Sequence, residues 1–453
     1  MGLDRRQVLG LATGGAIAAA LPLRGAAIAG PIGNHGLDAA SLGVRAGSPD
    51  DQSRALQEAI DRAAARAVPL VLGPGIYRAG GLMLPAGAHI MGVRGATRLV
   101  LTRGPSLVST AHADRLTLAG LTLDGAGLAL PEGRGLVHLA HARNLLVSDC
   151  EVTASGQHGL ALEAAEGAVT GNTVSASAGA AIFSRDAAGL RIAGNTIRGA
   201  GNNGILVWRS EPGDDGTLVT DNRIENIAAQ AGGSGQNGNA INIFRAGNVT
   251  VRGNRIRNAA FSAVRGNAAG NLQITGNTCT GLGEVALYAE FGFEGALIAG
   301  NLVDGAAVGI AVTNFNEGGR LAVVQGNLVR NLAAFRAAGA DPQDPAGVGI
   351  GVEADTAVSG NVVERAPSAG LLLGWRRYLR DVAATGNLVR DCGAGIAVSV
   401  AAGAGPAMIA DNLITGARRG AIVGMDGHTT VAAELADGAT RFPHLTIAGN
   451  RVR

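Results

Sequence analysis

The chain of 453 residues is 47% hydrophobic and only 16% charged, which excludes the polar, highly charged composition of disordered proteins. Its 37 Lys and Arg residues nearly balance its 35 Asp and Glu residues, and a net charge of +2 gives no basic surface of the kind that binds nucleic acid. We therefore expect a folded protein without a nucleic-acid partner. Because only 3% of the residues are aromatic, the core must consist mainly of Ala, Val, Ile and Leu.

The N-terminal segment has the features of an export signal. Arg5 and Arg6 precede an apolar run over residues 9–23, and an Ala-Ile-Ala sequence offers a cleavage site before Gly30. The pattern resembles a twin-arginine signal peptide over residues 1–29, so we expect the Tat translocon as a partner and a periplasmic or secreted location. The run is shorter than the roughly 20 residues of a membrane span. We expect no membrane span in the mature chain.

The next segment predicts a helix at the start of the folded part. Ser48 and Pro49 provide an N-cap and a first helical residue, and Asp50 and Asp51 an acidic first turn. We assign residues 30–100 to an N-terminal cap made of this helix and entry strands, because the end of a repeat protein must be covered. The apolar residues of one helical face are Ala55, Leu56, Ala59, Ile60 and Ala63.

The rest of the chain repeats one short pattern. A Gly-Asn or Asp-Asn dipeptide flanked by apolar residues recurs at spacings of 23 to 38 residues, as expected for one repeating coil with loop insertions. A second apolar stretch follows about ten residues after each Asn. The repeated asparagines are Asn172, Asn195, Asn222, Asn254, Asn277, Asn301, Asn327, Asn361, Asn387, Asn412 and Asn450.

These repeats predict an all-β protein, a right-handed parallel β-helix with two strands per coil and about eleven or twelve coils over residues 101–453. Strands of successive coils would pair about 4.8 Å apart. The asparagines would then hydrogen-bond to one another at the turn. A leucine-rich repeat fits residues 190–197, but not the other half of the period, which alternates like a strand.

The start of the repeat region resembles a known superfamily. The segments DDQSRALQEAIDRAA, VPLVLGPGIYRAGGLMLP and HIMGVRG are similar to the entry helix, the strand with its Pro-Gly-x-Tyr turn, and the first coil of pectin-lyase-like β-helix proteins. With the export signal and the Asn repeats, the chain resembles an uncharacterised family of twin-arginine-translocated repeat proteins. The superfamily includes lyases, hydrolases, epimerases, tailspikes and non-catalytic members, so the resemblance implies fold and export but no single activity.

The second strand of each coil predicts two outward columns, because successive side chains of a strand alternate between its faces. Aromatic planes, amides and arginines suit sugar stacking, hydroxyl recognition and carboxylate binding, so we predict a glycan-binding face. The predicted substrate-binding residues are Arg185, Trp208, Asn242, Phe244 and Asn267. The first column also contains Glu290, Thr313 and Glu353, and the second column Arg265 and Tyr288.

Four of these residues are candidate catalytic groups, with two chemistries open. Glu290 and Glu353 lie two coils apart, about 10 Å, close to the ~6.5–9.5 Å between the carboxyl groups of inverting hydrolases. Arg265 and Tyr288 lie on adjacent coils and would serve as an acid/base pair for β-elimination or epimerisation beside a uronate carboxylate. The resemblance implies clustered Asp residues for a hydrolase and a carboxylate-built Ca²⁺ site for many lyases. The sequence shows neither pattern, so we predict no metal site and no cofactor, and a bound calcium ion lacks support.

The remaining cysteines and aromatic residues suggest no further chemistry. Cys150, Cys279 and Cys392 lie far apart in sequence without a C-x-x-C motif, and we interpret them as buried, inert thiols. Scattered Met and Cys residues argue against a copper-handling role. Residues 375–378 are interpreted as a second binding patch or a packed turn.

Two functions remain open. The first is a periplasmic carbohydrate-active enzyme, a lyase or epimerase ahead of a hydrolase, with an acidic polysaccharide as its partner. The second is a non-catalytic glycan-binding or cell-envelope structural β-helix. An enzyme would need Arg265, Tyr288 and Glu290 within reach of one sugar unit in an open groove, whereas a structural protein could have this face covered by loops.

Overall fold

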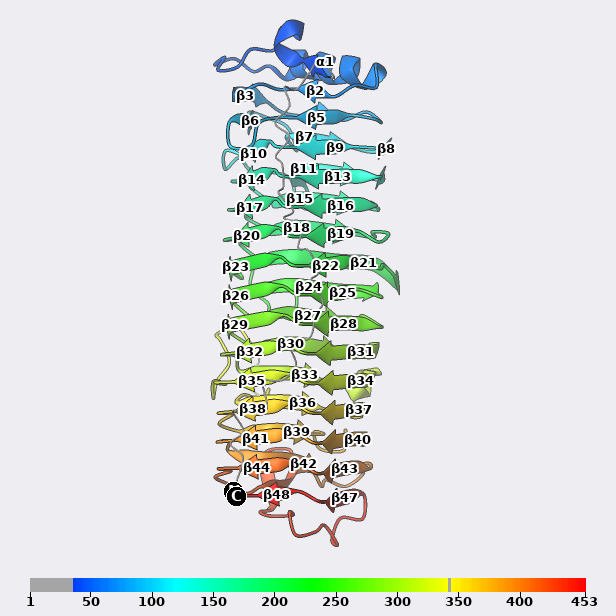
Figure 1. The fold of residues 1–453 in the computed structure, drawn as a ribbon, viewed down its shortest axis with the longest axis vertical. Coiled ribbons are helices and arrows are strands. Elements are labelled where there is room, and N and C mark those ends of the chain that lie inside the picture. Colours follow the sequence, from blue (N-terminus) through cyan, green and yellow to red (C-terminus); the bar gives the residue numbers. More distant parts are fainter. Residues whose placement is uncertain (1–35, 341–343) are drawn as a thin grey trace, which may run out of the picture. The chain divides into compact units, whose positions relative to one another are not determined.

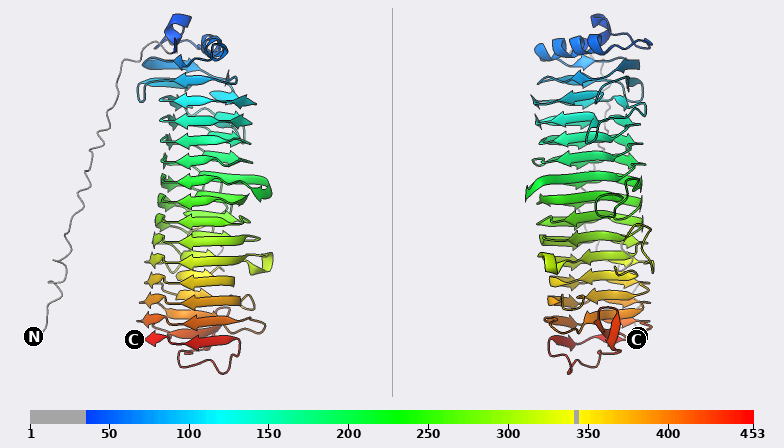
Figure 2. Two further views of the ribbon diagram at one scale, coloured as in Figure 1. Left: turned by 45° about the vertical axis from the view of Figure 1, so that its right-hand side comes forward. Right: turned by 180° about the vertical axis from the view of Figure 1, so that it is seen from behind.

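The computed structural model describes residues 36–340 and 344–453. The predicted twin-arginine signal at residues 1–29 lies outside the described residues. Within the described part, no helix has the length and hydrophobicity needed to cross a membrane. The described residues form a stack of parallel β coils with a helix at its N-terminal end (Figures 1 and 2).

Each regular coil contains three short strands, one in each of three sheets that we name A, B and C (Figure 1). The predicted parallel β-helix is confirmed, but the prediction of two strands per coil is wrong. The apolar segment around each Gly-Asn is two strands that meet at a corner, as in β19 (Arg191–Ala193) and β20 (Thr196–Arg198). Gly194 between them has φ 65°, a left-handed conformation that ends an extended strand and that glycine adopts without strain.

Sheet A begins every coil. Its sixteen strands in the described residues are, in order, β1 (Leu37–Asp38), β2 (Leu70–Val71), β5 (His89–Met91), β9 (Thr117–Ala119), β13 (Leu145–Ser148), β16 (Gly167–Thr170), β19, β22 (Leu218–Thr220), β25 (Thr250–Arg252), β28 (Leu272–Thr275), β31 (Glu294–Ala299), β34 (Arg320–Gln325), β37 (Ala354–Ser359), β40 (Arg380–Thr385), β43 (Ala407–Ala410) and β47 (Leu445–Ala448).

Sheet B follows the Asn corner. Its fifteen described strands are β3 (Gly75–Ala79), β6 (Thr97–Leu101), β10 (Thr122–Asp124), β14 (Glu151–Thr153), β17 (Thr173–Ser175), β20, β23 (Arg223–Ile227), β26 (Arg255–Ala259), β29 (Thr278–Leu282), β32 (Leu302–Asp304), β35 (Leu328–Arg330), β38 (Val362–Glu364), β41 (Leu388–Arg390), β44 (Leu413–Thr415) and β48 (Arg451–Val452).

Sheet C ends the coil and contains the predicted site columns. Its fifteen described strands are β4 (Leu82–Met83), β7 (Val108–Thr110), β11 (Gly135–Ala140), β15 (His158–Glu163), β18 (Ala180–Arg185), β21 (Asn203–Asp214), β24 (Asn239–Gly247), β27 (Val264–Asn267), β30 (Val285–Glu290), β33 (Val308–Val312), β36 (Val348–Val352), β39 (Ala369–Leu373), β42 (Ala394–Ser399), β45 (Ile422–Asp426) and β46 (Thr429–Ala432). Only β45 and β46 pair antiparallel among the described strands, and β8 (Ala113–Asp114) and β12 (Ala142–Arg143) form a separate pair.

The described solenoid has more coils than the eleven or twelve predicted, since sheet B contains fifteen strands and sheet C fourteen that pair in parallel, β46 being the antiparallel partner of β45. The first coils lack the repeated dipeptide. Leu121 and Cys150 stand at the corners that asparagine occupies later, before β10 and β14. Parallel pairing begins at β1 and β2, so strands within residues 30–100 already belong to the sheets of the solenoid.

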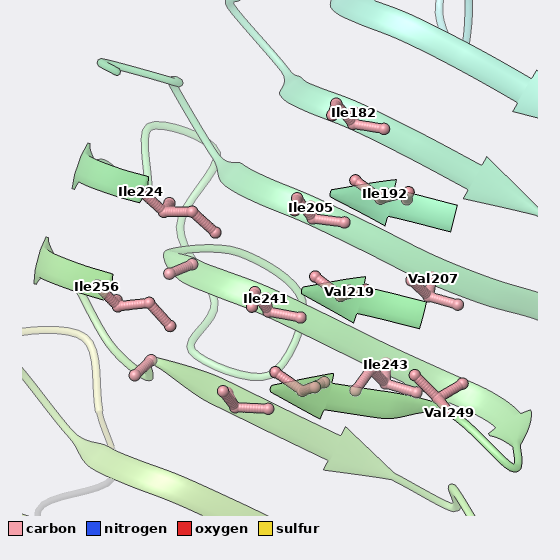
Figure 3. Close-up of a cluster of buried hydrophobic side chains, with 14 of the residues drawn as sticks. Ile182, Ile192, Ile205, Val207, Val219, Ile224, Ile241, Ile243, Val249 and Ile256 are labelled. Carbon is pink, nitrogen blue, oxygen red and sulfur yellow. The ribbon is translucent and has the colours of Figure 1, made fainter. Parts of the chain in front are cut away.

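The interior of the coils is filled by stacked aliphatic side chains (Figure 3). Ile182, Ile205 and Ile241 are consecutive partners in sheet C, and Ile224 and Ile256 are partners in sheet B. All five are at most 2% exposed. Burying each such side chain contributes about 1.5–3 kcal/mol, so the core is built coil by coil.

The predicted asparagine ladder is present at the corner between sheets A and B. Asn195 Nδ2 donates to Asn222 Oδ1 at 3.0 Å, and the backbone N–H of Asn195 donates to the same oxygen at 2.9 Å. Asn195 Nδ2 also donates to the carbonyl of Val169 in the preceding coil at 2.9 Å. The same bonds recur from Asn172 to Asn450, so the buried amides satisfy one another.

The predicted helix is α1 (Ser53–Ala65), and the short 3₁₀ helix η2 (Ala39–Leu42) precedes it. Of its predicted apolar face, Leu56, Ala59, Ile60 and Ala63 are buried in the same core as the coils, and Ala55 is partly buried against it. The predicted N-cap is wrong, because Gln52 occupies the N-cap position instead of Ser48. The backbone N–H of Gln52 is bound to the carbonyl of Arg78 on β3 at 2.7 Å, which delays the start of the helix.

Two long connections between sheets B and C are named loop 228–238 and loop 331–347, the second name standing for the described residues 331–340 and 344–347. The first joins β23 to β24 and the second joins β35 to β36. Loop 228–238 crosses the outer face of sheet C, since the carbonyls of Ser234 and Gly235 accept hydrogen bonds from Arg265 and Asn242. The paths of these loops determine which part of the predicted glycan-binding face of sheet C is accessible to a ligand.

Candidate functional site

The outer face of sheet C has the register that the sequence predicts. Asn242, Arg265 and Tyr288 are consecutive Cα partners on β24, β27 and β30. Beside them runs the first predicted column, which contains Arg185, Trp208, Phe244, Asn267 and Glu290. Thr313 and Glu353 directly follow β33 and β36, and the backbone N–H of Glu353 donates to the carbonyl of Val312 at 3.1 Å.

Arg265 and Glu290 form a buried ion pair. Arg265 Nε donates to Glu290 Oε1 at 2.6 Å and Arg265 Nη2 to Glu290 Oε2 at 2.9 Å, with side chains 8% and 1% exposed. Asn267 Nδ2 donates to Glu290 Oε1 at 3.1 Å, and Arg265 Nη1 to the carbonyl of Ser234 at 2.8 Å. Two of the four predicted catalytic groups and the predicted substrate-binding residue Asn267 are therefore bound to one another beneath loop 228–238.

A second arginine extends this buried cluster. Arg336, in loop 331–347, donates from Nη1 to Glu284 Oε1 at 2.8 Å, and Arg265 Nη1 donates to the other oxygen of Glu284 at 3.3 Å. Two arginines and two glutamates thus join both loops to sheet C. The sequence analysis missed Glu284 and Arg336. The sequence did contain a signal for them. Glu284 precedes the apolar strand β30 and Glu290 ends it, and buried carboxylates need cationic partners.

Asn242 is also covered. Its Nδ2 donates to the carbonyls of Gly235 and Gln236 at 3.2 and 3.4 Å, and the residue is 2% exposed. Its amide donor is used to hold loop 228–238 in place. Alternation along the strand places Asn242 on the outer face correctly but does not reveal the loop that crosses it.

Glu353 and Tyr288 have a different environment, because both line an open pocket of about 240 Å³ between loop 331–347 and the 3₁₀ helix η3 (Phe315–Glu317). Thr313, Trp375 and Tyr378 also line it. Trp375 and Tyr378 come from the turn after β39, where they form an isolated β-bridge. Residues 375–378 are therefore both a packed turn and a wall of this pocket.

Burial raises the pKa of Glu353 from 4.5 to about 7, although hydrogen bonds from the backbone N–H groups of Phe315 and Asn314 oppose the shift. Glu353 Oε2 accepts the hydrogen bond of Phe315 N–H at 2.7 Å. This contact fixes one oxygen of the carboxyl group. A half-buried carboxyl that holds its proton near neutral pH has the property of a general acid.

Tyr288 is poorly suited to act as a base. Burial, together with the negative charge of Glu290, raises the pKa of its phenol well above the ordinary value of 10.0. The guanidinium of Arg265 lies 5.1 Å from the ring centroid in a cation–π contact. Tyr288 therefore keeps its proton and can donate a hydrogen bond, and its ring forms part of the pocket wall.

The pocket continues as a wider groove of about 650 Å³ over the later coils of sheet C. The two share Arg336, Leu372 and Trp375 among their lining residues, and the wider part extends to Val423 and His428. The rings of Trp375 and His428 meet edge to face with centroids 4.8 Å apart. We name the combined feature, from Tyr288 to Val423, the Glu353 groove.

Arg185, Trp208 and Phe244 lie away from the Glu353 groove. Arg185 Nη2 pairs with Glu163 Oε1 at 2.8 Å. The Trp208 ring lies between those of Phe183 and Phe244, with centroids 5.7 and 5.6 Å away. Arg185 and Trp208 line a separate pocket that shares no residue with the Glu353 groove, so the predicted single face is divided into two.

Potential metal ligands are dispersed. Over residues 36–340 and 344–453, no three of the His, Cys, Asp and Glu side chains come together as a metal site. Cys150, Cys279 and Cys392 are buried and free. Burial raises the pKa of Cys150 to about 11 and that of Cys279 to about 12, which keeps both as unreactive thiols at neutral pH.

Two family models match parts of the chain. Residues 108–246 match the model described as "Periplasmic copper-binding protein (NosD)", and residues 212–380 match the model described as "Right handed beta helix region". Each match covers less than half of the chain. Together with the three parallel sheets, the second match identifies the fold as a right-handed parallel β-helix.

Solved structures show the same architecture at low sequence identity. The surface adhesin PfbA of Streptococcus pneumoniae is 13% identical, with 88% of this chain and 94% of that chain covered and a TM-score of 0.50. The pre-mature gene product 12 of bacteriophage phi29 is 13% identical, with coverage of 84% and 52% and a TM-score of 0.51. At such identity the likeness concerns the fold alone. A search among curated proteins finds no match.

Proposed function

We propose that this chain is a carbohydrate-active β-helix that binds a glycan in the Glu353 groove, with Glu353 as the proton donor to a glycosidic oxygen. One observation carries the proposal: a carboxyl group with a pKa raised to about 7 lies in an open pocket walled by Tyr288, Trp375 and Tyr378. Pyranose rings stack on such aromatic planes, and a protonated carboxyl is what a leaving sugar oxygen needs.

Hydrolysis is better supported than elimination or epimerisation. Elimination and epimerisation both need a base that removes a proton from carbon. The raised pKa of Tyr288 opposes its acting as that base. Arg265, the other member of the predicted acid/base pair, is held by Glu284 and Glu290. A hydrolase instead needs an acid, Glu353, and a second carboxylate. Asp344 lines the same pocket and is 3.3 Å from Arg336 Nη1.

An acidic glycan has less support than the sequence suggested. Arg185, Arg265 and Arg336 are each paired with carboxylates, so none offers an unneutralised guanidinium to a uronate. Arg419, however, lines the wider part of the Glu353 groove, so neutral and acidic glycans are both arms of the test. A periplasmic or secreted location is proposed from the N-terminal sequence and is consistent with the word "periplasmic" in the NosD description. The copper in that description is not carried over to this chain.

A non-catalytic glycan-binding or envelope-structural protein is the second candidate. The observation in its favour is the closed Arg265–Glu290 pair, because two of the four predicted catalytic groups are bound to each other under a loop. A glycan-binding protein of this kind would hold its ligand on the same face as the proposed enzyme. They differ in whether bonds are cleaved.

The test is a screen of the purified protein on neutral glucans and on uronate polysaccharides, with reducing ends measured for hydrolysis and near-ultraviolet absorbance for elimination. Glu353→Gln should lower turnover at least a hundredfold, the usual contribution of a general acid. Glu364→Gln is the matched control, since Glu364 ends β38 on sheet B, away from the groove.

Three outcomes decide the proposal. Turnover that depends on Glu353 but not on Glu364 supports it. Turnover that survives in Glu353→Gln contradicts the assigned role of Glu353. Binding of a glycan without products selects the non-catalytic candidate.

A further inference from the structure

We propose that a second glycan-binding groove, separate from the Glu353 groove, lies on the early coils of sheet C and is built on Phe183 and Trp208. It is a cavity of about 730 Å³, the size of a site for a few sugar units. Its floor is formed by β15, β18 and β21. Gly133, which precedes β11, and Gln236 and Asn237 of loop 228–238 also line it. The proposal takes its ligand class, a glycan, from the proposed function.

The floor of this groove is a series of rings on successive strands. His158 and Phe183 have centroids 4.9 Å apart, and Phe183 and Trp208 5.7 Å apart. The chain contains only two tryptophans and 3% Phe, Trp and Tyr residues, so Phe183 and Trp208 on consecutive coils beside His158 are a concentrated use of a scarce type. In this platform Phe183 is only 6% exposed, so the partly exposed Trp208 offers the ring face for pyranose stacking.

Trp208 carries a free-energy cost at this position. Its indole Nε1 is buried and has no hydrogen-bond partner in the described residues. An unpaired buried donor costs about 1–3 kcal/mol, which phenylalanine would avoid at this position. The large indole ring is therefore not explained by packing alone, whereas a larger stacking surface for a sugar accounts for it.

Polar groups around the platform are suited to neutral hydroxyls. Gln157 and Gln236 line the groove, and their side-chain amides make no hydrogen bond within residues 36–340 and 344–453. His158 Nδ1 accepts the backbone N–H of Ala180 at 3.0 Å, so the neutral ring carries its proton on Nε2. Arg185 is already paired with Glu163. The groove thus presents amides, a neutral histidine and the Glu132 carboxylate, all of which are groups that hydrogen-bond to sugar hydroxyls.

The two grooves are physically separate. Between Trp208 on β21 and Tyr288 on β30 lie the strands β24 and β27, a distance of about 14 Å at ~4.8 Å per coil. Loop 228–238 crosses this interval and is held there by Arg265 and Asn242. A glycan in the early groove therefore does not reach Glu353 without crossing the loop, and the early groove serves as an anchoring site instead of a reaction site.

Each groove contains one of the two tryptophans, which makes a direct test possible. In Trp375→Phe the sole tryptophan is Trp208, and in Trp208→Phe it is Trp375. Both variants are titrated with cellohexaose, maltohexaose and a mannuronate hexasaccharide while tryptophan fluorescence is followed. We expect at least one hexasaccharide to shift the Trp208 signal saturably, and Gln157→Ala in the Trp375→Phe background to weaken that binding about tenfold.

Arg198→Ala in the same background is the control, because Arg198 is an exposed arginine on sheet B beside Glu225. Its titration should match that of the parent. Circular dichroism confirms that each variant is folded.

The outcomes separate the two proposals. A saturable Trp208 signal weakened by Gln157→Ala supports the second groove, even if Trp375 is silent and the Glu353 groove fails its own test. A Trp375 response with an unchanged Trp208 signal overturns the second groove and leaves the proposed function intact. Silence of both reporters towards all three sugars contradicts both proposals.

Discussion

Arg265 on β27 and Glu290 on β30 lie diagonally across neighbouring strands and are joined by two parallel hydrogen bonds of 2.6 and 2.9 Å. The pair is buried and shares Glu284 with Arg336, so it connects the sheet to both covering loops. Removing one member of a buried pair leaves an uncompensated charge, whereas removing both members is far less costly. The pair therefore holds the face in shape and positions Tyr288, whose ring lies against Arg265.

Arg265→Met should destabilise the protein by about 3–5 kcal/mol, because Glu290 and part of Glu284 lose their cationic partner. The double variant Arg265→Met with Glu290→Gln should recover much of this loss. Thermal unfolding and amide exchange of loop 228–238 measure both effects. Arg320→Met is the control: Arg320 is 40% exposed, its partner Glu294 is 63% exposed, and its other partner Asp355 keeps Arg380, so the expected loss is below about 1 kcal/mol. Equal losses in the two arginine variants would contradict the structural role of Arg265.

Much of the fold follows from local sequence rules. Periodic Gly-Asn pairs predict coils, and alternation predicts the register that joins Asn242, Arg265 and Tyr288. The third strand of the coil was missed because β20 is only three residues long and directly follows Asn195. A strand this short has no periodicity of its own, and only the left-handed Gly194 marks the corner.

The site was less predictable, because burial on an outer face depends on loops whose paths no repeat specifies. Arg265 and Glu353 both belong to the predicted columns, yet loop 228–238 covers the first and leaves the second at an open pocket. The raised pKa of Glu353 depends on its burial beside η3, which joins β33 to β34. Alternation along a strand predicts which face a side chain occupies, whereas contacts with distant segments determine its burial, its partners and its pKa.

The asparagine ladder predicts a positional effect. Asn254→Ala removes an acceptor of the Asn222 backbone and side-chain N–H groups and leaves them buried without a partner. The expected loss is about 2–4 kcal/mol, the cost of two unsatisfied donors. At the described end of the ladder, Asn450→Ala removes the equivalent bonds to Asn412, but this corner is partly exposed and water can replace them. Thermal unfolding should therefore show a much smaller loss for Asn450→Ala, and equal losses would contradict this account.

We expect the stability of the protein to fall as the pH rises through the pKa of Glu353. Its pKa is raised in the folded state from 4.5 to about 7, so the folded protein holds the proton more tightly than the unfolded chain. This contribution to stability is fully present below pH 4.5 and is lost as the pH rises through about 7, with a size of about 3 kcal/mol. Glu353→Gln should flatten this part of the stability curve, and it should also remove the fall in any turnover above pH 7. A wild-type curve that is level between pH 5 and 8 would disprove the shift.

Cys150 offers a gain of stability, because it occupies the corner position that asparagine takes from the next coil onward. Its backbone N–H donates to Asn172 Oδ1 at 2.9 Å, as Asn172 N–H does to Asn195 Oδ1 at 3.0 Å. Its Sγ lies 3.5 Å from the carbonyl of Leu118, the strand partner of Val147, whose carbonyl accepts from Asn172 Nδ2. Cys150→Asn would extend the ladder by one coil.

We expect Cys150→Asn to raise the free energy of unfolding by about 1 kcal/mol, the net value of the added hydrogen bonds. Cys279→Asn is the matched comparison, since Cys279 is equally buried but stacks between Ile256 and Val303 in an aliphatic column. There the amide would have no ladder partner, and its burial should cost about 1–3 kcal/mol. Thermal unfolding of the two variants should therefore change in opposite directions, because stabilisation depends on the corner and not on the residue introduced. A loss of stability in both would show that the corner at Cys150 cannot continue the ladder.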